Sequence, residues 1–170
     1  MASLRQILAL VLLGAVLAAC GFQPLYKAPS GAKQAASVQR MATIDIPPIP
    51  DRSGQILRNE LRDQLLPRGR AAQALYRLDV SLKETQADLA ILQDATSTYS
   101  RYTADIKWVL TDLATDAPVL RGENRRITSF PIAESEFASL EAEKNARERA
   151  LSQLAEDVRL RLGLFFERGS

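Results

Sequence analysis

The segment Ala74–Leu82 constrains the fold most, because its apolar and polar residues alternate. From Tyr76 onward its even positions are apolar, while Arg77, Asp79 and Ser81 at the odd positions are polar. Successive side chains of a strand point to opposite faces of a sheet. This period of two therefore predicts a β-strand with one face against a core and the other in water.

A second run with the same period follows a predicted turn at residues 94–98. Its predicted inward residues are Tyr102, Ala104, Ile106, Trp108 and Leu110. Its predicted outward residues are Thr103, Asp105, Lys107 and Thr111. Between the two runs the apolar residues move to odd positions, at Ala87, Leu89 and Ile91. We expect either a bulge near residues 83–86 or a change of strand partner.

A third strand is predicted over Val119–Phe130, after a tight reversal at residues 115–118, but its faces are ambiguous. If Ile127 points inward, its face also carries Arg121, Glu123 and Arg125. If Leu120 and Phe130 point inward, Arg126 is turned inward instead. The faces of Arg125 and Arg126 therefore stay open at this stage.

The folded part begins with a short alternating segment at residues 43–46, which predicts a strand ended by prolines. A helix follows, for which Asp51 or Ser53 can act as the N-cap. Its apolar residues recur at i, i+4 and i+8, at Leu57, Leu61 and Leu65. Residues 66–69 contain Pro67 and Gly69 and are expected to end it.

The last predicted element is a long helix over residues 134–165, rich in good helix formers. At 100° per residue one face collects Phe137, Leu140, Leu151, Leu154, Val158 and Leu162. Lys144 and Arg147 fall on the same face, and we expect their stems to lie along the core with the charges in water. Alternatively, this part of the helix overhangs the sheet and presents cations to a partner. The pairs Glu143 with Arg147 and Asp157 with Arg161 have favourable i, i+4 spacing.

The element order is therefore strand, helix, three strands, helix. It predicts an α+β fold, a two-layer sandwich with two helices on one face of a four-stranded, mainly antiparallel sheet. The other face of the sheet is left without a covering layer. Such a face can simply be solvated, and it would also suit a water-filled cavity in another protein.

The first twenty residues predict export. Arg5 precedes an almost unbroken apolar run over residues 7–19, and small residues stand before Cys20, the single cysteine of the chain. The run is shorter than the roughly 20 residues that span a bilayer. We predict a lipoprotein signal peptide over 1–19, a lipidated Cys20 with a flexible tether over 20–40, and one domain over 41–168. A plain signal peptide followed by a free thiol is the alternative.

Composition excludes several classes of function. The chain has no histidine, and its one cysteine is assigned to lipidation, so zinc sites, Ser-His-Asp triads and disulfides are not expected. The net charge is only +2, which gives no reason to expect nucleic acid as a partner. No cofactor or metal site is predicted. A carboxylate hydrolase using Glu134 and Glu136, or Asp45 and Asp51, is a weak alternative, because the spacing does not force either pair together.

Two motifs resemble a known family. Leu17-Ala18-Ala19-Cys20 is similar to the bacterial lipobox and runs directly into Gly-Phe-Gln-Pro-Leu-Tyr at 21–26. The segment Ile-Pro-Asp-Arg-Ser-Gly-Gln-Ile-Leu-Arg-Asn-Glu-Leu at 49–61 is the second, supportive motif. Together they resemble the LptE family of lipopolysaccharide-assembly lipoproteins, in a variant similar to those of alphaproteobacteria, and the likeness extends over nearly the whole chain.

The resemblance implies a non-enzymatic protein anchored by lipid on the periplasmic side of the outer membrane. Members of this family sit in the β-barrel translocon LptD, plug its lumen, assist its assembly and bind lipopolysaccharide (LPS). Gly21 after Cys20 is similar to lipoproteins sorted to the outer membrane. An adaptor or pilotin for another envelope assembly machine, with the same anchor and fold type, is the alternative.

Binding of LPS would require cations that meet phosphate, for which guanidinium groups are well suited. Arg121, Arg125 and Arg126 place three guanidinium groups within six residues, and we predict them as the LPS-binding residues. Arg68 and Arg70 form a second, lower-ranked group.

Overall fold

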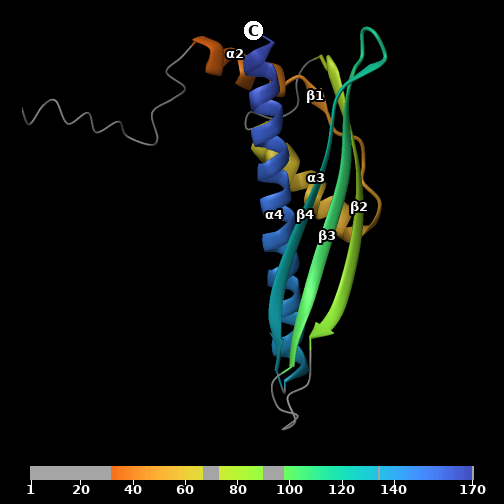
Figure 1. Cartoon of the computed structure of the whole chain (residues 1–170), viewed down its shortest axis with the longest axis vertical. Coiled ribbons are helices and arrows are strands. Elements are labelled where there is room, and N and C mark those ends of the chain that lie inside the picture. The colour runs from red at the N-terminus through yellow and green to blue at the C-terminus, as the bar shows by residue number, and fades with distance from the viewer. Residues whose placement is uncertain (1–31, 67–72, 90–97, 134, 170) are drawn as a thin grey trace, which may run out of the picture. The chain divides into compact units, whose positions relative to one another are not determined.

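The computed structural model describes residues 32–66, 73–89, 98–133 and 135–169 (Figure 1). Cys20 and the segment before residue 32 lie outside the described residues, as do the predicted turn at 94–97, Arg68, Arg70 and Glu134. The described elements, in chain order, are α2 (Ala32–Met41), β1 (Ile44–Asp45), α3 (Asp51–Leu65), β2 (Tyr76–Leu89), β3 (Thr98–Asp112), β4 (Ala117–Ile132) and α4 (Glu136–Arg168).

The four strands form one sheet in the order β1-β2-β3-β4. The short β1 runs parallel to β2, whereas β2–β3 and β3–β4 are antiparallel. The helices pack on one side of the sheet, as Figure 1 shows for α3 and α4. The predicted α+β sandwich with a mainly antiparallel sheet is confirmed, with three described helices in place of the predicted two.

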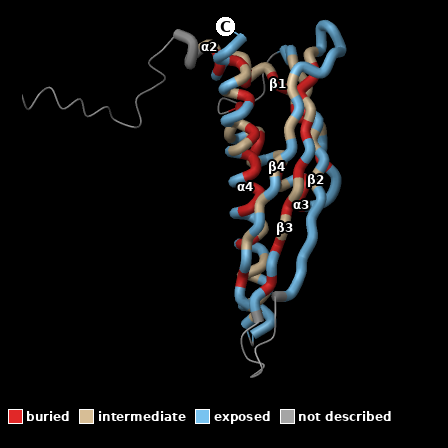
Figure 2. Tube along the Cα trace, viewed as in Figure 1, coloured by how far each residue is buried: buried red, intermediate tan, exposed pale blue. Residues whose placement is uncertain are grey.

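The core lies between the helices and the inward face of β3 (Figure 2). All five residues predicted to point inward from β3 are at most 2 % exposed, which confirms its period of two up to Leu110. Thr111, predicted to point outward, is buried, and it lies at a register shift with β4. From the helices, the core receives Leu57, Leu61 and Leu65 of α3 and Leu151, Leu154, Val158 and Leu162 of α4. The predicted N-caps of α3 are wrong, because the helix begins at Asp51 itself: Pro50 is the N-cap residue and no side chain caps the helix.

The predicted bulge near residues 83–86 is wrong, and so is the predicted change of partner. Strand β2 pairs with β3 without a register shift from Tyr76 to Leu89. Residues 83–88 are all exposed, so no core there requires apolar residues on the inward positions. The register shift lies instead between β3 and β4, where Leu110 pairs with Leu120 and Thr111 pairs with Pro118, leaving Val119 as an extra residue.

Strand β4 adopts the second of its two predicted arrangements. Phe130 is buried and Leu120 packs against the core, whereas Ile127 is 56 % exposed on the opposite face. Arg126 therefore points toward α4, and its Nη2 lies 2.5 Å from Oδ1 of Asp157. This ion pair also replaces the predicted pairing of Asp157 with Arg161.

The tether predicted over residues 20–40 does not hold for residues 32–40, which form most of α2. Ser37 and Met41 are buried, and Nη1 of Arg40 donates a hydrogen bond to the carbonyl oxygen of Gly169, 3.3 Å away. Helix α2 is therefore held by contacts with residues far away in the chain. Its small and polar composition gave no apolar period from which to predict it.

The prediction that Phe137 and Leu140 face the core is wrong, because they are 74 % and 58 % exposed. Both Ala146 and Phe166 of α4 are buried. Twenty residues at 100° each place them about 160° apart around the helix axis. The buried face thus moves around this 33-residue helix as it crosses a twisted sheet. The assumption of one fixed buried face, made from the sequence, is therefore wrong for the first turns of α4.

Candidate functional site

The face of the sheet away from the helices, here called the outer face, carries polar side chains in regular rows. The register places Ser81, Lys107 and Glu123 side by side, and Lys83, Asp105 and Arg125 in the next row. Within the described part of the chain, no element packs over these rows (Figure 1). The uncovered face predicted from the sequence is therefore present.

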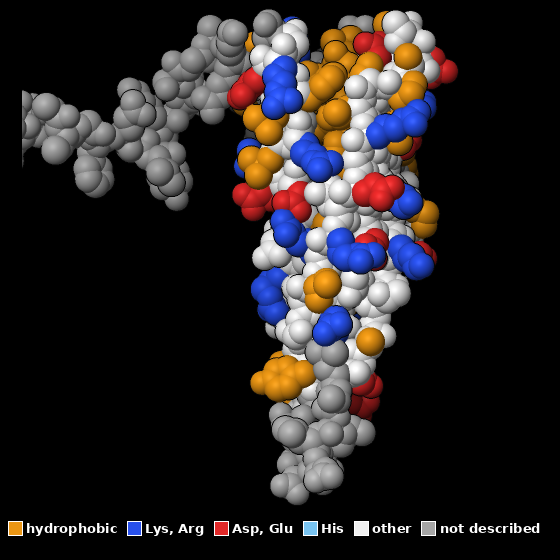
Figure 3. All heavy atoms as spheres, viewed as in Figure 1, with side chains coloured by type: hydrophobic (Ala, Val, Ile, Leu, Met, Phe, Trp, Pro, Cys, Tyr) orange, Lys and Arg blue, Asp and Glu red, His pale blue; other side chains and the backbone are white. Residues whose placement is uncertain are grey.

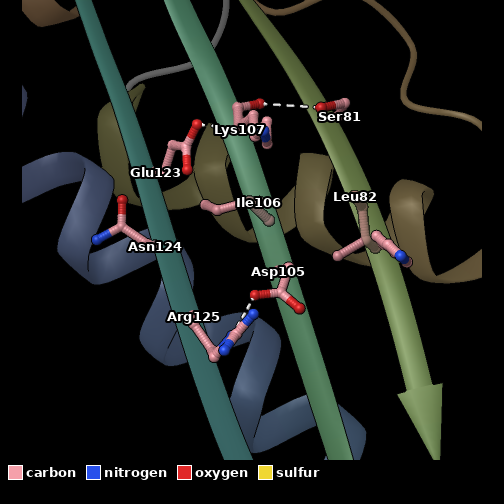
Figure 4. Close-up of a pocket in the computed structure, with 9 residues that line it drawn as sticks. Ser81, Leu82, Asp105, Ile106, Lys107, Glu123, Asn124 and Arg125 are labelled. Carbon is pink, nitrogen blue, oxygen red and sulfur yellow. Dashed lines mark hydrogen bonds and ion pairs between the residues drawn. The ribbon is translucent and has the colours of Figure 1, made fainter.

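Ion pairs connect neighbouring strands across this face (Figure 4). Lys107 Nζ lies 3.2 Å from Glu123 Oε1, and Arg125 Nε lies 2.5 Å from Asp105 Oδ1. The hydrogen bond and the charge of Asp105 raise the pKa of the Arg125 guanidinium. Because these groups are solvated, the two pairs contribute little to the stability of the fold. The same solvation leaves the charges accessible to a ligand.

The outer face is more basic than the protein as a whole. Three of its cations are in the ion pairs of Lys107, Arg125 and Arg77, the last with Asp79. Three further cations make no ion pair with any described residue: Lys83, Arg101 and Arg121. Six cations against four carboxylates, which include Asp45 of β1 beside Arg77, give this face a net charge of +2, as large as that of the full chain. Figure 3 shows both basic and acidic side chains on the visible part of the sheet.

The middle of the outer face is hollowed. A cavity of about 610 Å³ is lined by Ser81, Lys83, Asp105, Lys107, Glu123 and Arg125, among others. In Figure 4 the side chains of Asp105 and Arg125 meet in front of the sheet, with the helices behind it. This volume is in the range of small-molecule sites, which are commonly 300–1,000 Å³. The lining, however, is a polar strand surface open to solvent, suited to a charged amphiphile rather than to a small apolar ligand.

The three predicted LPS-binding arginines do not converge. Arg121 and Arg125 both lie on the outer face, because residues an even number of positions apart in a strand point to the same side of the sheet. Arg126 points to the helix side and pairs with Asp157, so it does not belong to this surface. Lys83, Arg101 and Lys107 join the surface from β2 and β3, and only the strand register reveals that they are neighbours.

A second polar cluster ties β2, β3 and α4 together on the helix side. Arg147 Nη2 lies 2.5 Å from Glu143 Oε1, which confirms the predicted i, i+4 pair, and its Nε lies 3.5 Å from Glu84 Oε1. The guanidinium carbon is 5.6 Å from the ring centroid of Tyr102. Burial, together with a hydrogen bond from its hydroxyl to Glu84, raises the pKa of Tyr102. The stem of Arg147 lies against the sheet, as expected, whereas Lys144 is exposed. The contacts of this cluster connect α4 to two strands of the sheet and so help to stabilise the fold.

Two further properties of the described residues concern metal ions and membranes. No group of three or more His, Cys, Asp or Glu side chains that could hold a metal ion occurs among them. None of the helices in the described ranges is long and apolar enough to cross a membrane. The fold and the outer face thus define a small α+β domain whose conspicuous surface is an open, basic sheet.

Most of the chain matches the model of one protein family. Residues 41–162 match the family described as "LptE: Lipopolysaccharide-assembly", which covers more than half of the chain. The chain belongs to the LptE family, a family of non-enzymatic LPS-assembly lipoproteins. None of the curated protein sequences compared with it matches significantly.

Solved structures show the same fold. A lipoprotein structure from Caulobacter crescentus CB15 superposes with a TM-score of 0.62 at 22 % identity, covering 78 % of this chain and 97 % of the other. A minor lipoprotein from Acinetobacter baumannii gives a TM-score of 0.54 at 10 % identity, with 71 % and 90 % covered. At these identities the likeness concerns the fold alone.

Proposed function

We propose that this protein is an outer-membrane lipoprotein that seats in the LptD barrel, assists its assembly and binds LPS on its way to the outer leaflet. The family match over residues 41–162 carries the proposal. The anchor is an acylated Cys20, and the LPS-contacting surface is the outer face, with Arg121 and Arg125 among its cations.

The chemistry of the outer face supports a position inside a water-filled lumen. A sheet that buries one face and keeps charged residues on the other is stable only where that second face stays hydrated. The lumen of a large barrel is polar and meets this condition. The solvated ion pairs of Lys107 with Glu123 and of Arg125 with Asp105 would be retained there.

The anchor sets how far the domain can be from the membrane. Ten residues lie between Cys20 and Gly31, the last residue before α2. Fully extended, this segment spans at most about 40 Å. One acyl chain would bind a membrane only marginally, whereas several on one cysteine give stable attachment. The short connection raises the effective concentration of the domain beside a barrel in the same membrane.

Affinity purification of the full chain from detergent-solubilised outer membrane tests this proposal. A large outer-membrane barrel should co-purify in stoichiometric amount, and LPS should be retained by the complex. Recovery of the lipoprotein without any barrel would refute the proposal. Recovery with the components of a different envelope machine would favour the adaptor or pilotin alternative.

A further inference from the structure

The outer face changes in character along the strands. Beyond the row of Lys83, Asp105 and Arg125, the described residues of this face include no carboxylate. They include Arg101, which has no ion-pair partner among the described residues, and two exposed apolar side chains. Ile127 is 56 % exposed and Tyr99 is 51 % exposed. Ile127 shares its row with Thr85 and Thr103, so the row that follows the cations of Lys83 and Arg125 is uncharged and partly apolar.

The opposite end of the sheet has a different charge. Its two rows on the outer face hold two cations, Arg77 and Arg121, and two carboxylates, Asp45 and Asp79, so they carry no net charge. Two further carboxylates follow at the end of β3 and in the turn after it, Asp112 and Asp116, the latter with a φ of 51°. Exposed apolar residues occur at this end too, since Leu113 is 40 % exposed, but they are next to carboxylates that would repel phosphate.

We propose that an acylated, phosphorylated glycolipid lies lengthwise on the outer face with a defined direction. Its phosphates meet Lys83 and Arg125, and its acyl chains run over Ile127 toward Tyr99. This inference rests on the proposed function, since it specifies how LPS occupies the surface. Charge complementarity selects the ligand, because a face with a net charge of +2 fits a phosphorylated amphiphile, and the rows without carboxylates beside its cations expose Ile127 and Tyr99 to the hydrophobic tail.

The spacing of the rows is compatible with this direction. Neighbouring residues on one face of a strand are about 7 Å apart, so Ile127 follows Arg125 at that distance. The row of Tyr99 lies two steps beyond the row of Ile127, about 14 Å further. Arg101 lies between these rows, and its methylene stem can line an acyl chain while its guanidinium reaches the solvent or a phosphate. The ligand thus meets charge first and apolar surface second.

Four variants of the full-length lipoprotein test the direction, with intact LPS and deacylated LPS as probes. Lys83→Gln removes a cation without breaking an ion pair to any described residue, and Ile127→Thr keeps the β-branched shape but removes apolar surface. Arg77→Gln and Leu113→Thr are matched controls from the other end of the sheet. All four positions are at least partly exposed, so the variants are expected to fold.

We expect Lys83→Gln to weaken binding of both probes by about tenfold. Ile127→Thr should weaken binding of intact LPS by about fivefold and leave deacylated LPS unchanged. The two controls should change neither affinity by more than about twofold. Phosphatidylglycerol vesicles should compete poorly, because they lack the phosphorylated sugar.

Other outcomes overturn the inference in distinguishable ways. If Leu113→Thr weakened binding of intact LPS and Ile127→Thr did not, the glycolipid would lie in the opposite direction on the outer face. If phosphatidylglycerol vesicles competed as well as LPS does, the outer face would bind anionic lipids in general. Normal binding by all variants would exclude the outer face while leaving the proposed function intact. Failure of the unaltered protein to bind LPS at all would reject both this inference and the LPS-binding part of the proposed function.

Discussion

Replacement of Gly122 by alanine tests how β4 is seated against the core. Gly122 pairs directly with Trp108 across the strands, and the Trp108 ring lies over it. A Cβ atom at position 122 would lie 2.3 Å from Cζ2 and 2.5 Å from Cε2 of that ring. Contacts this short cannot be tolerated, and Trp108 is only 1 % exposed, so the ring has no free space to move into.

Two costs determine the expected magnitude. Overpacking of a filled core typically costs about 1–3 kcal/mol. A displaced indole would also lose the hydrogen bond that Trp108 Nε1 donates to Asn124 Oδ1 at 3.0 Å, which is worth about 0.5–1.5 kcal/mol. We therefore expect Gly122→Ala to lower the free energy of unfolding by about 2–4 kcal/mol, a large part of the stability of an ordinary domain.

Urea unfolding followed by tryptophan fluorescence is a suitable assay, because Trp108 is the single tryptophan of the chain. Gly163→Ala is the matched control. It lies in α4, and a Cβ atom there would meet nothing within 4 Å. Alanine is favoured over glycine inside a helix, so this variant should be more stable by about 0.5–1 kcal/mol. A Gly122→Ala midpoint equal to that of the unaltered protein would refute the described packing of Trp108.

Three further outcomes are expected. Asp157→Ala should destabilise the fold by about 1–3 kcal/mol, because it leaves the partly buried Arg126 without its partner, whereas Glu156→Ala at the exposed neighbouring position should change stability by less than about 0.5 kcal/mol in urea unfolding. The raised pKa of Tyr102 predicts that the free energy of unfolding falls above about pH 10, since the unfolded chain loses that proton while the folded chain retains it. Tyr102→Phe should make this decline shallower, and an unchanged slope would contradict the assignment. Cys20→Ser should leave the domain folded but shift it from the membrane to the soluble periplasmic fraction in cells that lack the barrel, and a membrane-bound variant there would contradict the lipid anchor.

Much of the architecture follows from local pattern. The inward face of β3 was predicted correctly because every residue on it is apolar, so one strand specifies its own orientation. The i, i+4 leucines of α3 gave its buried face for the same reason. In these two segments the local pattern of apolar residues is enough to predict which side chains are buried.

The remaining features depend on contacts between distant residues. The pattern within β4 allowed an inward Arg126 as one of two arrangements, but its ion-pair partner, Asp157 of α4, is 31 residues away and could not be read from that pattern. Phe137 is exposed because the sheet twists beneath α4, which a helical projection cannot represent. Among the cations of the outer face, only those of β4 are close in sequence. Lys83 and Arg125 become neighbours through the register with Asp105, so a search for local clusters of arginine grouped Arg126 with residues of the other face and could not include Lys83.

The measurement that tests the central claim most directly is the amount of LPS at the cell surface after depletion of this protein. The account predicts that surface LPS falls while LPS accumulates inside the envelope, and that the unaltered protein restores it. It also predicts weaker restoration by a variant that carries both Lys83→Gln and Ile127→Thr. Normal surface LPS in cells that have lost the protein would contradict the account.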